Sequence, residues 1–221
     1  MVASFKFRAV SVLVCFLLRG RSLSTKLEFI IPTWNEIYKL LLDLADRVRQ
    51  DGFKPDAIVG VSRGGWPPAR IMSDLLENPV LANVKAEFYC GVAETKGKPV
   101  ITQPVSISVK GKKLLIVDDV ADSGKSLRLV RKHLKEKGAV DVKIAAIYYK
   151  PWSVVTPDYY ERETRAWIIF PWERKEAVRN IVERYKRQGK SMEEAKERLV
   201  SSGMDPKIIE RFLQEISEGQ A

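Results

Sequence analysis

Apolar and polar residues follow one another in blocks that predict alternating strands and helices. Mainly apolar runs, which are typical of buried parallel strands, occupy residues 56–61, 114–117 and 142–147. Apolar residues at helical spacing predict helices over residues 34–50, 69–76 and 126–137. This succession predicts an α/β fold in which helices flank a central parallel sheet, and a chain of 221 residues is long enough to bury its core.

The most informative segment follows the run at 114–117, which ends in two acidic residues, Asp118 and Asp119. A short loop of small and hydroxyl-bearing residues comes next and leads into the helix expected at 126–137. Such a loop directs backbone N–H groups and a helix N-terminus at its ligand, and both favour an anion. The segment therefore predicts a phosphate site, with two acids beside it that suit sugar hydroxyls.

Other sites with similar residues fit less well. The loop ends in Gly124, Lys125 and Ser126, as the P-loop of nucleoside-triphosphate hydrolases does, but the earlier glycine of that motif is replaced by Asp119. No G-x-G-x-x-G dinucleotide motif follows an expected strand. A capped helix start would explain one acid, but not two acids followed by a loop of hydroxyls and glycine.

Residues 117–126 resemble the phosphoribosyl diphosphate (PRPP) motif of the type I phosphoribosyltransferases. The resemblance implies that fold, with a small hood beside the central sheet. It implies that Asp118 and Asp119 bind the ribose hydroxyls or Mg²⁺, directly or through water. It also implies that the following loop cradles the 5′-phosphate of PRPP, through Ala121, Asp122, Ser123, Gly124, Lys125 and Ser126.

A second loop follows the apolar run at 56–61 and consists of Ser62, Arg63, Gly64 and Gly65. Pro68 then suits the first turn of the next helix. An arginine and closely approaching backbone amides are suited to a diphosphate. By resemblance this is the pyrophosphate-binding loop, and the family pattern predicts a non-proline cis peptide near Ser62–Arg63.

Further positions resemble the xanthine-guanine branch of the family. Its 6-oxopurine enzymes have an acid beside the purine N7, matched by Asp122, and a lysine that donates to O6, matched by Lys150. Trp167 and Ile168 match a Trp-Ile pair that stacks on the base and binds its edge. The resemblance implies that Asp122 is catalytic and either handles the N7 proton or stabilises its positive charge. The remaining tryptophans are interpreted as packing residues: Trp34, Trp66, Trp152 and Trp172.

The resemblance implies a Mg²⁺-dependent transfer of the phosphoribosyl group from PRPP to xanthine, guanine or hypoxanthine, which is a purine salvage reaction. Residues 91–110, after a strand expected at 85–90, are polar with glycines and prolines and predict a mobile hairpin. In the family this segment closes over PRPP. The segments around 29–30 and 167–170 would build the hood.

The family-like domain is expected at residues 26–180. Residues 1–25 are expected to be an N-terminal extension that is disordered or results from a mis-assigned start, and their apolar stretch at 12–18 is too short to span a bilayer. Residues 181–221 are expected to form a helical C-terminal extension in which Asp205 caps the last helix.

The formal net charge of +10 raises the alternative of a non-catalytic PRPP-binding regulator that binds nucleic acid. The cations are spread through the helices, so nucleic acid binding is not expected. The presence of Asp122, Lys150 and Trp167 together also argues against a regulator, which does not need a base site. An adenine phosphoribosyltransferase stays a third hypothesis. Two cysteines and one histidine offer no metal-ligand spacing. A cytoplasmic homodimer or higher homo-oligomer, without a membrane partner, is the expectation.

Overall fold

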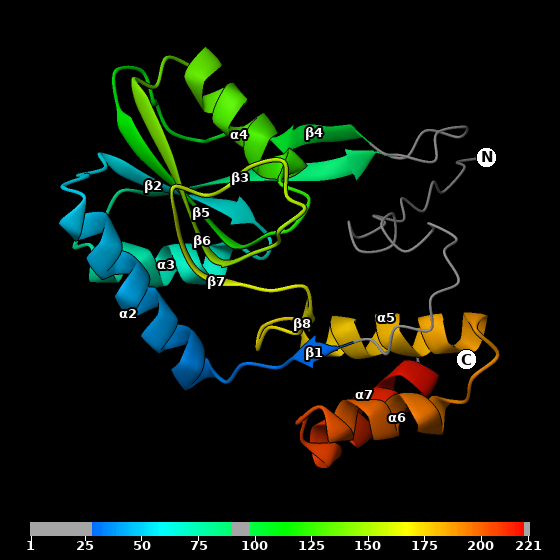
Figure 1. Ribbon diagram of the computed structural model, residues 1–221. Coiled ribbons are helices and arrows are strands. Elements are labelled where there is room, and N and C mark those ends of the chain that lie inside the picture. Colours follow the sequence, from blue (N-terminus) through cyan, green and yellow to red (C-terminus); the bar gives the residue numbers. More distant parts are fainter. Residues whose placement is uncertain (1–27, 90–97, 219–221) are drawn as a thin grey trace, which may run out of the picture. The chain divides into compact units, whose positions relative to one another are not determined.

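The computed structural model describes residues 28–89 and 98–218 (Figure 1). Its residues divide into two compact units, one containing Leu41–Glu163 and the other the described parts of Thr25–Leu40 and Thr164–Ala221. Helix α2 (Trp34–Gln50), which has the bounds predicted from the sequence, begins in the second unit and ends in the first. The extension predicted for residues 1–25 lies outside the described residues.

The first unit is built on a six-stranded sheet in the order β4-β3-β2-β5-β6-β7. Neighbouring strands in the run from β3 to β7 are parallel, and the predicted central parallel sheet is confirmed. The strands of this run are β2 (Ala57–Ser62), β3 (Leu81–Tyr89), β5 (Lys113–Ala121), β6 (Asp141–Tyr149) and β7 (Tyr159–Glu163).

One edge of the sheet is an antiparallel hairpin made of β3 and β4 (Lys98–Gln103). The prediction of a strand at 85–90 followed by a hairpin within 91–110 was wrong in its bounds, because β3 starts at Leu81 and forms the first arm itself. The tip of the hairpin lies outside the described residues.

Helices cover both faces of this sheet (Figure 1). Alternate residues of a strand point to opposite faces, and Val59 and Ile116 share an apolar cluster with Leu127 of α4 (Lys125–Glu136). On the opposite face Gly60 lies against α3 (Trp66–Leu75), where an added Cβ would be 2.9 Å from the Cβ of Ala69. This packing leaves the carboxyl ends of the parallel strands for the loops that carry the predicted site.

The second unit contains a short parallel pair, β1 (Phe29–Ile30) and β8 (Trp167–Ile168). These strands lie in the two segments predicted to build the hood, and that role stays a prediction. Three helices follow: α5 (Arg174–Arg187), α6 (Met192–Ser201) and α7 (Pro206–Glu218). They enclose an apolar cluster of their own, which includes Ile181, Leu199 and Ile209.

Local hydrogen bonds define the ends of these helices. The Ser191 hydroxyl accepts a hydrogen bond from the Glu194 N–H at 3.1 Å, and the Glu194 carboxylate accepts one from the Ser191 N–H at 2.8 Å, which is a capping box. Asp205 accepts a hydrogen bond from the Lys207 N–H at 2.9 Å, so its predicted capping role is confirmed. The predicted domain boundary at residue 180 falls inside α5.

Candidate active site

Asp118 and Asp119 lie on β5, because that strand continues past its apolar run and pairs with β6 as far as Ala121. Asp119 is only 7% exposed, and its Oδ1 accepts a hydrogen bond from the Val120 N–H at 2.7 Å. Burial, and then the neighbouring Asp119 charge, raise the pKa of Asp118 well above its ordinary value. A hydroxyl donor or a hard cation at this pair would relieve that repulsion.

The predicted phosphate loop lies between β5 and α4. Gly124 has the left-handed φ of 70°, and a Cβ on it would collide with the Ser153 hydroxyl and lie 2.8 Å from the Val155 nitrogen. Lys125 and Ser126 belong to the first turn of α4, so the helix begins one residue earlier than the sequence predicts. The loop therefore meets the helix N-terminus, which favours bound anions.

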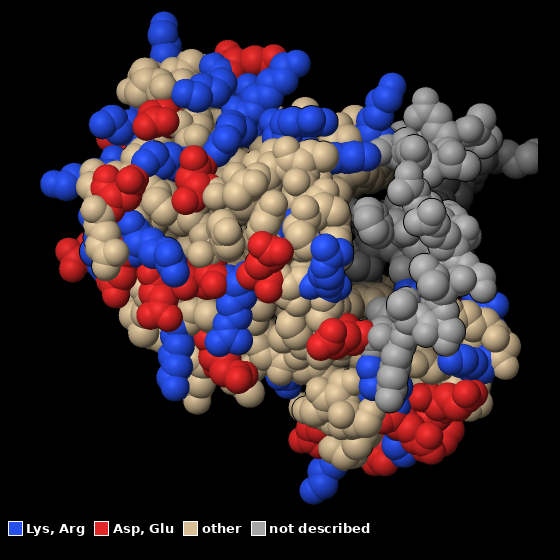
Figure 2. Space-filling view, in the orientation of Figure 1, with Lys and Arg blue, Asp and Glu red and all other residues tan. Residues whose placement is uncertain are grey.

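Helix α4 carries many basic side chains. Lysine and arginine side chains gather over α4 on the face in Figure 2, where the helix contributes Lys125, Arg128, Arg131, Lys132 and Lys135. Arg131 is paired with Asp158 and Lys132 with Glu136. Positive charge at a site of this kind favours the approach of phosphorylated ligands.

The second loop follows β2, the strand next to β5 in the sheet. The peptide bond between Ser62 and Arg63 is cis, and the prediction of a non-proline cis bond there is confirmed. Gly64 lies so close to Asp119 that an added Cβ would be 2.7 Å from the carboxyl carbon. At Gly65 a Cβ would be 2.5 Å from the Val117 carbonyl oxygen. Both glycines thus let the loop approach the acidic end of β5.

The structure brings Asp122 and Lys150 to neighbouring positions through one tryptophan. The Trp152 indole N–H donates to Asp122 Oδ1 at 3.0 Å, and the Lys150 ammonium nitrogen is 5.6 Å from the centre of the Trp152 ring. Lys150 is 6% exposed; burial lowers its pKa, and the charge of Asp122 partly opposes that effect. The backbone N–H of Lys150 donates to the Ala121 carbonyl at 3.1 Å. This bond connects the end of β6 to the phosphate loop.

The interpretation of Trp152 as a packing residue is therefore wrong: its side chain is 38% exposed and bonded to Asp122. Its place two residues after Lys150 suggests that it lies near the base site, but no local pattern indicates its bond to Asp122. Trp34 and Trp66 are also exposed rather than packed in a core, at 53% and 42%.

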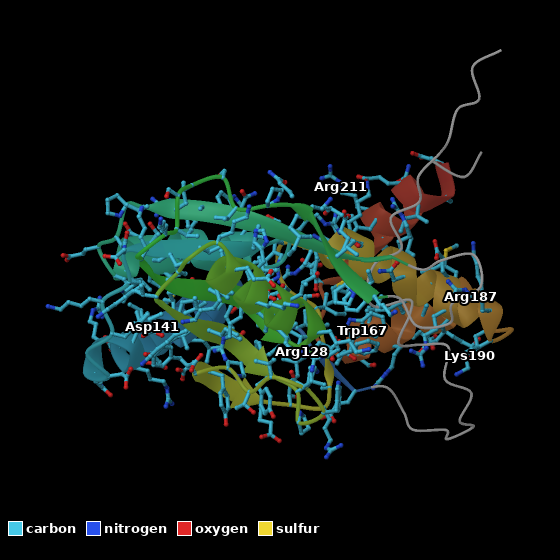
Figure 3. The ribbon with its side chains drawn as sticks, turned by 90° about the horizontal axis from the view of Figure 1, so that it is seen from above. Arg128, Asp141, Trp167, Arg187, Lys190 and Arg211 are labelled. Atoms are coloured by element: carbon cyan, nitrogen blue, oxygen red, sulfur yellow. The ribbon has the colours of Figure 1, made fainter. Side chains whose placement is uncertain are left out.

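Trp167 and Ile168 lie in the second unit, on β8 (Trp167 is labelled in Figure 3). Trp167 is partly exposed, and its ring centre lies 5.9 Å from that of Phe29. Ile168 is buried and pairs with Ile30. Their predicted contact with a base stays a prediction.

Within residues 28–89 and 98–218, no group of three or more His, Cys, Asp or Glu residues could hold a metal ion. The same part of the chain has no helix long and apolar enough to cross a membrane.

A family model described as the phosphoribosyl transferase domain matches residues 31–178. The chain belongs to this family. The match covers both loops at the acidic end of β5 and the segment that carries Lys150 and Trp167. The phosphoribosyltransferase family and fold predicted from residues 117–126 are thereby confirmed, as is the class of enzyme.

Individual phosphoribosyltransferases agree with this assignment. The xanthine-guanine phosphoribosyltransferase of Gluconobacter oxydans is 32% identical to this chain, over 64% of the chain and 82% of that protein. The enzyme of the same name from Cereibacter sphaeroides is 34% identical, over 64% of the chain and 84% of that protein. A crystal structure of a purine phosphoribosyltransferase from Pyrococcus horikoshii is similar with a TM-score of 0.60 and 41% identity, covering 66% of this chain and 93% of that one.

Proposed function

We propose that this phosphoribosyltransferase transfers the 5-phosphoribosyl group of PRPP to a 6-oxopurine, namely xanthine, guanine or hypoxanthine. The products are the purine nucleoside 5′-monophosphate and pyrophosphate, which makes the reaction a purine salvage step. The observation that carries the proposal is the arrangement of Asp122 and Lys150, an acid and a cation linked by Trp152 beside the phosphate loop. The names of the relatives at 32% and 34% identity include two of these bases, xanthine and guanine.

PRPP has three recognisable parts, and the first unit has suitable residues for each. The 5′-phosphate is assigned to the loop of residues 121–126, because it ends at the N-terminus of α4. The diphosphate is assigned to Ser62, Arg63, Gly64 and Gly65, whose glycines allow close backbone approach. The ribose hydroxyls are assigned to Asp118 and Asp119.

Magnesium fits the same acids. Mg²⁺ is commonly bound by one or two carboxylates, with substrate phosphates and water completing its octahedron. Asp118 and Asp119 supply such a pair, and the raised pKa of Asp118 indicates that its ionised form would gain from a cation. When bound, the ion would neutralise charge on the leaving diphosphate.

The base is assigned to Asp122 and Lys150 and, from the resemblance to the xanthine-guanine branch, to Trp167 and Ile168. A protonated lysine donates to a carbonyl such as O6, and it cannot accept from the amino group that adenine has at that position. Trp167 would supply a stacking surface for the purine, and the backbone at Ile168 would bind its edge.

The reaction then needs no protein nucleophile. The bond between C1′ and the diphosphate oxygen breaks, and its electron pair leaves with pyrophosphate, held by the loop that contains Arg63. A purine nitrogen forms the new bond to the oxocarbenium-like C1′. Asp122 accepts the proton that N7 loses, a role of the kind that contributes about 10²–10⁴-fold to rate.

The β3–β4 hairpin is proposed to close over PRPP and exclude water. A homodimer or higher homo-oligomer and a cytoplasmic location stay predictions that follow from the family.

The first test is pyrophosphate release from PRPP and Mg²⁺, with xanthine, guanine, hypoxanthine and adenine offered separately, beside a titration of PRPP binding. Turnover on the oxopurines but not on adenine is expected. Turnover on adenine alone would overturn the role of Lys150, and tight PRPP binding without turnover on any base would favour the regulator.

A further inference from the structure

Trp152 contacts both of the charged side chains that we assign to the purine. Its indole has an electropositive N–H edge and an electronegative face. The N–H meets the Asp122 carboxylate at 3.0 Å, and the Lys150 ammonium nitrogen lies 5.6 Å from the ring centre. One side chain therefore offers each of two opposite charges a partner of suitable polarity.

The backbone around Trp152 is fixed to the phosphate loop. Lys150 N–H donates to the Ala121 carbonyl at 3.1 Å, and Val154 N–H donates to the Ser123 carbonyl at 3.0 Å. Gly124 packs against Ser153 so closely that a Cβ would not fit between them. The turn that carries Trp152 is thus held on both sides of its side chain.

The charges themselves need to be kept at a fixed separation. Asp122 and Lys150 attract each other, because the charge of Asp122 raises the pKa of Lys150 against the effect of burial. A direct ion pair between them would have to be broken before either could bind a ligand. N7 and O6 lie on the same edge of a 6-oxopurine, so an acid for one and a donor for the other must stand side by side without joining.

We infer that Trp152 is a positioning residue that holds the Asp122 carboxylate and the Lys150 ammonium beside each other without a direct ion pair, so that they can face N7 and O6 on one edge of the purine. The N–H of Trp152 occupies Oδ1 of Asp122 and leaves Oδ2 to accept the proton from N7. This inference rests on the proposed function, because the ligand edge is that of the proposed substrate.

The test compares wild type, Trp152→Phe and Trp34→Phe in steady-state kinetics with guanine and PRPP varied in turn. Phe at 152 keeps an aromatic face for Lys150 but removes the N–H that fixes Asp122. Trp34→Phe makes the same chemical change at an exposed tryptophan of the second unit to which no substrate is assigned.

Trp152→Phe is expected to lower kcat/KM for guanine by about tenfold or more, the usual effect of losing a hydrogen bond to a charged group. The KM for PRPP and the Tm are expected to stay within about twofold and a few degrees of wild type. Trp34→Phe is expected to match wild type in kcat/KM for both substrates.

Two outcomes would overturn the inference. Unchanged guanine kinetics in Trp152→Phe would mean that Asp122 is positioned without the indole. Equal losses for guanine and PRPP would mean that Trp152 only supports the phosphate loop. Failure of the proposed function would look different, because wild type itself would then turn over none of the three 6-oxopurines.

Discussion

Replacing Gly64 by alanine tests whether the close approach of the two loops is needed for PRPP. The added methyl carbon would lie 2.7 Å from the Asp119 carboxyl carbon and 2.9 Å from its Oδ1, and closer still to Oδ2. Ordinary van der Waals contact begins at 3.4 Å, so the carboxyl carbon would have to retreat by about 0.7 Å. Asp119 is 7% exposed and has little free space around it.

The retreat would weaken the bond between Asp119 Oδ1 and the Val120 N–H, now 2.7 Å long. Hydrogen bonds to charged groups contribute about 1.5–3 kcal/mol. If the binding of ribose or Mg²⁺ by Asp119 loses the same free energy, the PRPP affinity falls by about 10- to 150-fold, at 1.4 kcal/mol per tenfold. We expect a loss in that range for Gly64→Ala.

The assay is a calorimetric titration of PRPP with Mg²⁺, paired with thermal melts. Gly52→Ala is the control, because its methyl would meet nothing within 4 Å while its φ of 68° disfavours alanine. This control should lose about 1–2 kcal/mol of stability and keep its PRPP affinity. PRPP binding by Gly64→Ala within about twofold of wild type would refute the reasoning.

Three other variants extend the test. Because the pKa of Asp118 is raised on folding, the folded state holds a proton that the unfolded chain releases, and stability falls as pH rises above the ordinary value of 3.8. Asp118→Asn should therefore raise Tm near neutral pH, with the gain vanishing at acid pH, and lower turnover; an unchanged neutral-pH Tm would contradict this. Lys150→Met should raise the KM for guanine by about tenfold or more without weakening PRPP binding. Because burial lowers the pKa of Lys150, its loss should not lower Tm. Equal kinetic losses for guanine and PRPP would count against the O6 role. Ser191→Ala should lower the free energy of unfolding by about 0.5–2 kcal/mol in denaturant titrations with unchanged turnover, through loss of the capping box; no change in stability would show that the box contributes nothing.

The sequence predicts the central strands well, because parallel strands buried on both faces are continuously apolar. It does not give the bounds of β4, which lies inside the expected hairpin, and it misses β7. These two strands lie at the edges of the sheet and carry polar residues. Helix α5 is missed for a related reason: most of its residues are charged, and its buried side chains form a narrow stripe that includes Ala177 and Ile181.

The sequence likewise predicts some parts of the candidate site and not others. The residues of each loop are consecutive in sequence, so their chemistry can be inferred from the loop alone. The bond between Trp152 and Asp122 joins residues 30 positions apart, and no local pattern indicates it. The contact of Gly64 with Asp119 depends on β2 and β5 being neighbours in the sheet. Contacts of this kind are set by topology, which the sequence defines only indirectly.

The apolar stripe of α5 carries information about other members of the family. The family match ends at residue 178, inside this helix, yet Ile181 and Val182 beyond it are buried in the cluster that α6 and α7 complete. Shortened to the family length, the chain would present both side chains to water, at about 25 cal/mol for each Å² exposed. A relative that keeps two large aliphatic residues at these positions is therefore expected to continue into two further helices, and one that ends early is expected to have polar residues there. The residue types at these two positions are thus expected to distinguish long from short members of the family.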